Sequence, residues 1–231
     1  MGKWKTYSSS NLKKDKFWPN PIVINKKKIN LIKKNFLNSV KMAIKSGFDC
    51  IEIHMAHGYL LHQFFSPICN NRNDEYGGSL KNRCRLLLEI SQSIYNFAKK
   101  KNIIIGARIT GHDWVKDGIN FKDSIYLTKQ LEMIGFDYIC VSSGGIKTKT
   151  NLNTKAKFNL KLSSKLKSNT SLLVRVAGNI KDVVEAKKII KNKKADLVAF
   201  GRPFLKNPNF LFKDKKKIND VPKPYLRAFN I

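Results

Sequence analysis

Apolar and polar positions follow two different periods along the chain. Between residues 29 and 46 the apolar side chains recur every three to four positions, which is the spacing of a helix with one buried face. Gly47 follows at the place where a glycine commonly closes a helix. Residues 50–54, Cys-Ile-Glu-Ile-His, are instead rich in β-branched side chains and predict a strand. A helix, a glycine and a strand in direct succession are typical of the tight connections in a parallel α/β fold.

The same pattern recurs along the rest of the chain. Residues 1–28 show no period and contain a Trp-Pro-Asn-Pro break, so we expect an irregular N-terminal segment. Ser79 is expected to cap the next helix, and Gly135 to end the one after it. We predict helices at 79–98, 122–134, 156–167 and 181–191, and strands at 103–110, 138–143, 172–177 and 196–200, with a loop between residues 54 and 79.

Five predicted strands alternating with helices require a parallel sheet with right-handed crossovers. This leaves a doubly wound sheet or a (β/α) barrel. The strands end in polar residues or glycines, at His54, Arg108, Ser143-Gly144, Gly178 and Gly201-Arg202. A doubly wound sheet concentrates its site at one switch point, whereas a barrel carries functional residues at all its strand ends. The pattern therefore favours an α/β fold of the barrel type.

Length and composition suit one domain with a buried core, because 42% of the 231 residues are hydrophobic. No stretch approaches the roughly 18 consecutive apolar residues of a membrane span, and the basic N-terminus lacks the apolar segment of a secretory signal. The four cysteines contain no Cys-x-x-Cys pair. We expect them to be reduced packing residues, with Cys50 and Cys140 in buried strands. A cytoplasmic protein without membrane contact is the expectation.

The formal net charge of +29 raises the question of nucleic-acid binding. Lysines are spread over nearly every predicted helix and loop, usually opposite the apolar face, which indicates solvated surfaces. Arginine, the residue of bidentate phosphate and base recognition, is much rarer and is concentrated near the candidate site. We therefore expect no specific nucleic-acid partner. A basic polyanion-binding protein remains an alternative, which requires affinity that survives physiological salt.

Two histidines and a tyrosine follow the first predicted strand. His54 and His57 lie at its C-terminal end, where the side chains of α/β folds project into a common mouth, and Tyr59 is two residues further on. Imidazoles can hold a carbonyl oxygen or oxyanion while a phenol donates a proton. Zinc binding by His54, His57 and Cys69 is the alternative, but no fourth ligand has suitable spacing, so we expect no metal. Taken singly, each residue would also fit an ordinary packing role.

The later strand ends carry a second kind of signal. Arg108 is the one charge in an apolar strand, and a buried arginine needs an anionic or polar partner. Gly178, Gly201 and Arg202 suit a phosphate held by backbone amides and a guanidinium, as in the phosphate sites of barrels.

Several motifs in this order resemble one known family. Glu-Ile-His-Met-Ala-His-Gly-Tyr-Leu-Leu at 52–61 is followed by Asn-Asp-Glu-Tyr-Gly-Gly-Ser at 73–79, Val-Ser-Ser-Gly-Gly at 141–145, Ala-Asp-Leu-Val-Ala-Phe-Gly-Arg at 195–202 and Pro-Tyr-Leu-Arg-Ala at 224–228. The set resembles the old yellow enzyme family of flavin-dependent ene reductases, most closely the bacterial NADPH dehydrogenase and xenobiotic reductase branch. The resemblance extends over nearly the whole chain. It implies FMN as cofactor and NADPH or NADH as reductant.

The resemblance also implies roles for the substrate side of the site. His54 and His57 match the pair that binds the carbonyl oxygen of an α,β-unsaturated substrate, and Tyr59 matches the proton donor to the α-carbon. Met55 and Ala56, between the histidines, are assigned with them to substrate binding. Arg227 matches a C-terminal arginine that can reach the site of a neighbouring subunit.

On the cofactor side, the resemblance places Arg108 beside the N1 and O2 edge of the flavin, where a positive charge stabilises the reduced ring. Gly178, Gly201 and Arg202 match the phosphate cradle. His54 and Gly144 are the further residues assigned to cofactor binding.

The front of the chain departs from the family pattern. The resemblance implies three βα units before the strand at 50–54, and here only about 50 residues precede Glu52. We therefore expect residues 1–231 to form a single incomplete flavin-binding domain, a partial TIM (β/α)8 barrel with about five C-terminal βα units. A five-stranded arc cannot close. The chain is then either one half of a split enzyme, completed by an N-terminal fragment or a homo-oligomer, or a non-catalytic remnant.

Overall fold

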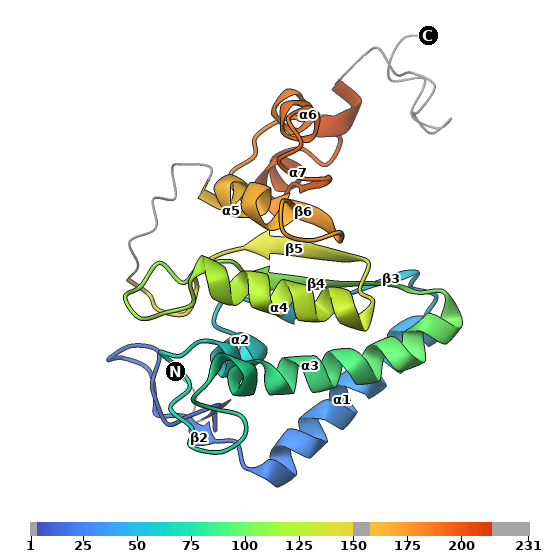
Figure 1. Cartoon of the computed structure of the whole chain (residues 1–231). Helices are drawn as coiled ribbons and strands as arrows, with labels where there is room; N and C mark the ends of the chain where they lie inside the picture. Colours follow the sequence, from blue (N-terminus) through green and yellow to red (C-terminus); the bar gives the residue numbers. More distant parts are fainter. Residues whose placement is uncertain (1–3, 150–157, 214–231) are drawn as a thin grey trace.

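Five parallel strands form the sheet around which the protein is built. The computed structural model describes residues 4–149 and 158–213. The strands pair in chain order, from β3 to β7, so each is joined to the next through a crossover on one side of the sheet (Figure 1). Their bounds are Cys50–Met55 for β3, Ile104–Thr110 for β4, Tyr138–Ser142 for β5, Leu173–Ala177 for β6 and Leu197–Ala199 for β7. The prediction of a partial α/β barrel with five βα units is confirmed.

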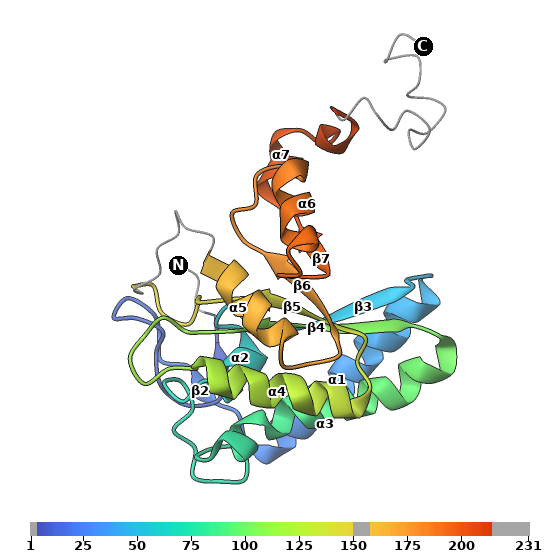
Figure 2. The ribbon, with the colours of Figure 1, turned by 45° about the horizontal axis from the view of Figure 1, so that its top comes forward.

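The helices line one face of this sheet. Helices α1, α3, α4 and α5 pack pairwise in sequence order, and α5 and α6 lie against β6 and β7 (Figures 1 and 2). Asn25, Ser79 and Asn120 cap their N-termini through side-chain hydrogen bonds, as helix starts require. The helices are α1 Lys26–Lys45, α2 Leu60–Phe65, α3 Leu80–Ala98, α4 Phe121–Ile134, α5 Phe158–Lys167, α6 Val183–Lys191 and α7 Arg202–Lys206, with short 3₁₀ turns η1 at Lys99–Lys101 and η2 at Phe210–Lys213.

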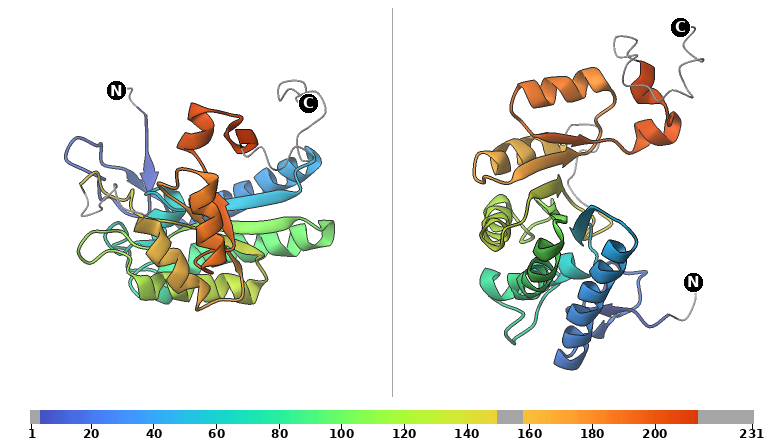
Figure 3. Two further views of the ribbon diagram at one scale, coloured as in Figure 1. Left: turned by 90° about the horizontal axis from the view of Figure 1, so that it is seen from above. Right: turned by 90° about the vertical axis from the view of Figure 1, so that its right-hand side faces the viewer.

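The two faces of the sheet differ in chemistry. Alternate side chains from β3 to β6 point toward the helices and form the apolar core, among them Ile53, Ile105, Ile139 and Val174. The opposite, concave face carries polar and charged residues, and Figure 3 shows the arc of strands from two sides. The strand register aligns His54, Arg108, Cys140 and Arg175 in one row across this face. Parallel pairing therefore brings together residues that are far apart in the sequence.

The N-terminal segment is more ordered than the sequence predicted. Tyr7–Ser8 (β1) and Ile22–Val23 (β2) form a small parallel sheet, and α1 begins at Lys26, inside the segment predicted to be irregular. Arg72 joins this segment to the loop before α3. Its Nη1 donates to the carbonyl oxygens of Ser9 (2.9 Å) and Ile24 (2.7 Å). These contacts depend on a residue far along the chain, so local pattern does not reveal them.

Two other predictions need correction. The segment between residues 54 and 79 is not all loop, because α2 forms within it and buries Leu61, His62, Phe64 and Phe65. Cys50 is exposed rather than buried, because it begins an edge strand; all four cysteines are free, and the other three are buried. In the described part of the chain, no helix is long and apolar enough to cross a bilayer.

The concave face is packed around one glycine. A Cβ atom on Gly106 would lie 2.1 Å from Cζ of Tyr138, so the tyrosine ring occupies the space above β4. The Arg175 guanidinium lies 5.0 Å from the same ring centroid and forms an ion pair with Glu52 of β3. Residues of β3, β4, β5 and β6 thus meet in one layer below the strand ends.

We expect Gly106→Ala to lower the free energy of unfolding by about 1–3 kcal/mol, because the added methyl group must displace the Tyr138 ring. Urea unfolding followed by circular dichroism measures this change. The single variant Tyr138→Leu and the double variant Gly106→Ala/Tyr138→Leu complete a double-mutant cycle. If the ring is the obstacle, the glycine substitution costs less in the Tyr138→Leu background; equal costs in the two backgrounds would refute the packing argument.

Candidate functional site

Three aromatic side chains meet at the C-terminal end of β3. The ring centroids of His54 and His57 are 5.1 Å apart, and so are those of His54 and Tyr59. Tyr59 is 63% exposed, so its phenol reaches solvent at the mouth of the arc. The structure therefore brings together the three residues that the sequence proposed as catalytic.

A strained turn positions His57. Its φ is +60° and that of Gly58 is +74°, so the chain turns sharply before α2 begins. A Cβ atom on Gly58 would lie 2.4 Å from the carbonyl oxygen of Gly145, which follows β5. The Nε2 atom of His57 lies 2.5 Å from Oγ of Ser142, the last residue of β5. The loops after β3 and β5 are thus in direct contact at the mouth.

Both mouth histidines are held neutral. Burial, and after it the nearby charges of Arg108 and His54, lower the pKa of His57 to about 4. Burial and Arg108 also lower the pKa of His54, whereas Glu52 opposes them. The backbone N–H of Ala56 donates to Nδ1 of His54 (3.2 Å), which leaves the ring proton on Nε2. Each ring can therefore donate a hydrogen bond near neutral pH without carrying a charge.

A buried network behind the mouth was not found from the sequence. Gly58 donates its N–H to Nδ1 of His62 (2.7 Å), and Nε2 of His62 donates to Asp113 (2.9 Å). The Ser66 hydroxyl and the Ile119 N–H also donate to Asp113. Burial alone would raise the pKa of Asp113, but these hydrogen bonds hold it below its ordinary value. The spacing of His62 from His57 carried no signal, since only the fold of α2 brings it under the turn.

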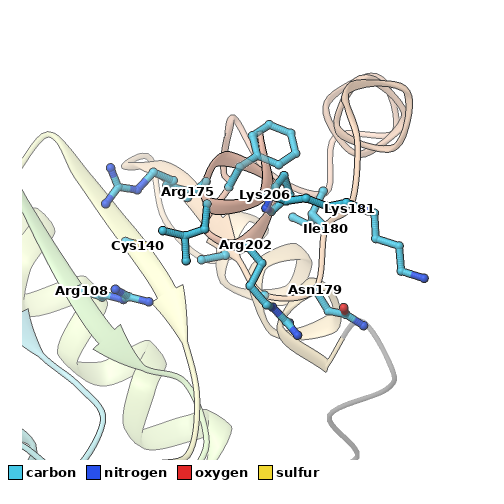
Figure 4. A pocket seen from close by; sticks show the side chains of 15 residues that line it. Arg108, Cys140, Arg175, Asn179, Ile180, Lys181, Arg202 and Lys206 are labelled. Carbon is cyan, nitrogen blue, oxygen red and sulfur yellow. The ribbon is translucent and has the colours of Figure 1, made fainter. Parts of the chain in front are cut away.

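A cavity of about 720 Å³ opens beside the mouth, at the C-terminal ends of β4 to β7. Arg108, Gly178, Gly201 and Arg202, all predicted to bind a cofactor, line it together. Figure 4 shows Arg108 reaching in from the sheet, with Arg202 on the side of the cavity formed by α7.

The cavity is strongly cationic. Arg175, Lys181 and Lys206 line it in addition to Arg108 and Arg202, and none of the described residues that line it carries a carboxylate. The Nε atom of Arg108 is buried and has no hydrogen-bond partner within the described residues. An unpaired buried guanidinium N–H and five cations fit an anionic cofactor with acceptor atoms, such as a flavin phosphate. Arg175, Lys181 and Lys206 were not predicted from the sequence: lysine is common throughout the chain, and Arg175 lies inside a predicted strand and not at its end.

Four predicted residues stand apart from these two groups. Gly144 does not line the cavity and donates its N–H to the carbonyl oxygen of His112 (2.9 Å). Met55 is fully buried in the core, on the helix side of the sheet, so its side chain packs there and does not face the mouth; Ala56 is also buried. Arg227 lies outside the described residues, and its role stays a prediction.

A family model and several curated proteins match most of this chain. The model of the NADH:flavin oxidoreductase / NADH oxidase family matches residues 7–221. The NADPH dehydrogenase of Clostridium acetobutylicum is 38% identical over 215 residues, which cover 91% of this chain and 62% of that protein. The NADPH dehydrogenase of Bacillus subtilis is 32% identical over 208 residues, which cover 88% of this chain and 60% of that protein.

Solved structures share the fold. Morphinone reductase in complex with tetrahydroNAD superposes with a TM-score of 0.74 at 22% identity, covering 99% of this chain and 61% of that one. 2-Naphthoyl-CoA reductase reaches a TM-score of 0.81 at 20% identity, covering 88% of this chain and 32% of that one.

The chain thus spans about 60% of the length of these two dehydrogenases. The resemblance to the old yellow enzyme family that the motifs indicated is confirmed by the match over most of the chain. The chain belongs to the NADH:flavin oxidoreductase / NADH oxidase family, whose cofactors are FMN and a nicotinamide nucleotide.

Proposed function

We propose that this site reduces an α,β-unsaturated carbonyl compound or a related acceptor with hydride from FMN that NADPH or NADH has reduced. The observation that carries the proposal is that His54, His57 and Tyr59 lie beside a cationic cavity. Arg108, which lines this cavity, stands next to His54 on the adjacent strand. A hydride donor in the cavity and an acceptor at the mouth would be neighbours.

The residues of the cavity would hold FMN at two ends. Gly178, Gly201 and Arg202 would receive the phosphate, and Arg108 would donate its unpaired Nε–H to the flavin ring. FMN, when bound and reduced, supplies the hydride for the β-carbon of the acceptor. A cation beside the ring stabilises the negative charge of the reduced form.

The residues of the mouth would act on the acceptor. His54, with its proton on Nε2, and His57 would donate hydrogen bonds to the acceptor oxygen and so draw electrons from the β-carbon. For His57 to donate from Nδ1, its Nε2 accepts from the Ser142 hydroxyl. The Tyr59 phenol would give its proton to the α-carbon, and solvent can return that proton because the side chain is exposed. The double bond thereby gains one hydride and one proton.

The proposal includes three further βα units. The sheet ends at β3 and β7, and each of these strands has one edge unpaired within the described residues. Unpaired edges and an open concave face favour association with further strands. We propose that these units come from a separate chain or from another part of a longer protein, with assembly of several copies as the alternative. If no such units exist, a non-catalytic role for the chain is the competing hypothesis.

We expect the chain alone to bind FMN weakly or not at all, and to gain stoichiometric flavin when it is coexpressed with the N-terminal part of the Clostridium acetobutylicum NADPH dehydrogenase that it does not match. Flavin absorbance of the purified material measures this.

In the coexpressed complex, Arg202→Ala should weaken FMN binding about tenfold or more, since a hydrogen bond to a charged group contributes about 1.5–3 kcal/mol.

Two variants control this experiment. Arg202→Lys should lose less affinity, because it keeps the charge without the two-pronged geometry. Lys129→Ala, which removes an exposed cation from α4, should leave FMN binding unchanged. Equal FMN affinities of the two coexpressed complexes, one with the Arg202→Ala variant and one with the unaltered chain, would contradict the assigned phosphate site.

Neutral His57 predicts a pH dependence of stability. Its pKa is about 4 in the folded chain against 6.5 ordinarily, so below about pH 6.5 the unfolded chain binds a proton that the folded chain does not. The free energy of unfolding should therefore fall as the pH decreases from about 6.5 to about 4. In His57→Asn, which tolerates the positive φ, the fall should be smaller. Urea unfolding at about pH 7 and about pH 5 tests this. The prediction is refuted if the free energy of unfolding changes by the same amount between the two pH values in His57→Asn and in the unaltered chain.

The network behind the turn makes His62 a positioning residue for His57. His62→Asn keeps an acceptor at the place of Nδ1 for the Gly58 N–H, whereas His62→Gln keeps a donor for Asp113 but loses that acceptor. We expect the pKa of His57, measured by NMR titration, to stay low in His62→Asn and to rise toward 6.5 in His62→Gln. Equal values in the two variants, at comparable stability, would leave His62 with a packing role only.

A further inference from the structure

Asp137, the residue before β5, forms two hydrogen bonds with the neighbouring strand β4. Asp137 donates its backbone N–H to the carbonyl oxygen of Ile105 (2.9 Å), and its carboxylate accepts the N–H of the same residue (2.7 Å). Both backbone groups of Ile105, the second residue of β4, are therefore held by one side chain and its own backbone. The contact fixes the start of β4 against the start of β5.

The same pair of hydrogen bonds, which we call the aspartate clasp, occurs before β7. Asp196 donates its N–H to the carbonyl oxygen of Val174 (2.8 Å), and its carboxylate accepts the N–H of Val174 (2.9 Å). Val174 is again the second residue of its strand, β6. An aspartate before a strand thus clasps the second residue of the preceding strand in the sheet.

Asp49 occupies this position before β3. The sequence Gly-Phe-Asp at 47–49 repeats the Gly-Phe-Asp at 135–137. The carbonyl oxygen of Asp49 accepts the N–H of Ile104 in the following strand (3.0 Å), as the carbonyl oxygen of Asp137 accepts that of Leu173 (3.2 Å). Within residues 4–149 and 158–213, neither the N–H nor the carboxylate of Asp49 has a hydrogen-bond partner. These are the two groups that form the clasp in Asp137 and Asp196.

We propose that Asp49 is the docking point for a parallel β-strand along the free edge of β3, and that it clasps the backbone N–H and carbonyl of the second residue of that strand. The occupant is the strand nearest in sequence order among the further βα units of the proposed function, on which this inference rests. The described chain contains the receiving half of the contact, and the arriving strand needs only backbone groups.

The exposed side chains of the concave face support this occupant. Ile104, Leu173 and Leu197 begin β4, β6 and β7, and they are 49%, 50% and 42% exposed. They lie at the same end of the sheet as Asp49, since all of them are at strand starts. Three further βα units would cover them from the other side of the barrel.

A second copy of the chain fits the edge less well. A two-fold axis between two β3 edges would pair them antiparallel, because symmetric contacts place each strand opposite its own copy. The clasp of Asp137 and Asp196 occurs between parallel strands. A parallel strand of a different sequence is therefore the partner that these contacts select.

The test measures association of the full chain with the unmatched N-terminal part of the Clostridium acetobutylicum NADPH dehydrogenase, by calorimetry without flavin. Asp49→Ala should weaken this association about tenfold or more, because it removes the hydrogen bond to the carboxylate, and a hydrogen bond to a charged group contributes about 1.5–3 kcal/mol. It should leave the urea unfolding of the isolated chain unchanged. Asp49→Asn, which retains an acceptor oxygen, should weaken association less.

Asp137→Ala is the matched control, because it breaks the same clasp inside the chain and should lower the stability of the isolated chain. Association equal for Asp49→Ala and the unaltered chain overturns the inference, and so does the absence of any association by the unaltered chain. A complex that depends on Asp49 but binds no FMN supports the inference and instead refutes the proposed function.

Discussion

The register of the parallel strands is the constraint on which the rest of the structure depends. Neighbouring strands lie about 4.8 Å apart, so residues paired in register stand side by side across the sheet. The pairing of β3 with β4, β5 and β6 places His54, Arg108, Cys140 and Arg175 in one row. A shift of one residue in any pairing would turn the affected side chains toward the helices. The apolar residues on the helix side hold this register, because any shift would expose them.

The row also sets the electrostatics of the site. Arg108 stands beside His54 and helps to keep both mouth histidines neutral, and it lines the cationic cavity at the same time. One guanidinium thus favours uncharged donors on one side and an anionic cofactor on the other. The Glu52–Arg175 ion pair connects this row, through Arg175 on β6, to Glu52 of β3 in the layer below. The negative charge of Glu52 therefore partly offsets the positive charges of Arg108 and Arg175 on the concave face. The local charge near the mouth thus differs from the high positive charge of the whole chain.

The same hydrogen bonds that build the sheet leave its ends open. In the clasps of Asp137 and Asp196, each strand start is secured by the residue before the next strand. A closed barrel would repeat this relation around the ring, whereas the described arc stops at β3 and β7. Because the mouth lies on β3, the edge strand, its surroundings on one side depend on whatever pairs with that edge. Assembly and chemistry are therefore linked through one strand.

The sequence by itself determined the elements of the sheet and the chemistry at its strand ends. Helical and strand periods are local properties, so the five strands and most helix bounds followed from them, and the motifs around His54, Arg108 and Arg202 identified the family. The tertiary structure alone decided which of these residues meet. Met55 proved to be a core residue because alternate strand positions face opposite sides, and Cys50 is exposed because β3 is an edge. The His62–Asp113 network, the cations around Arg108 and the unpaired groups of Asp49 depend on contacts between distant segments, which no local pattern records.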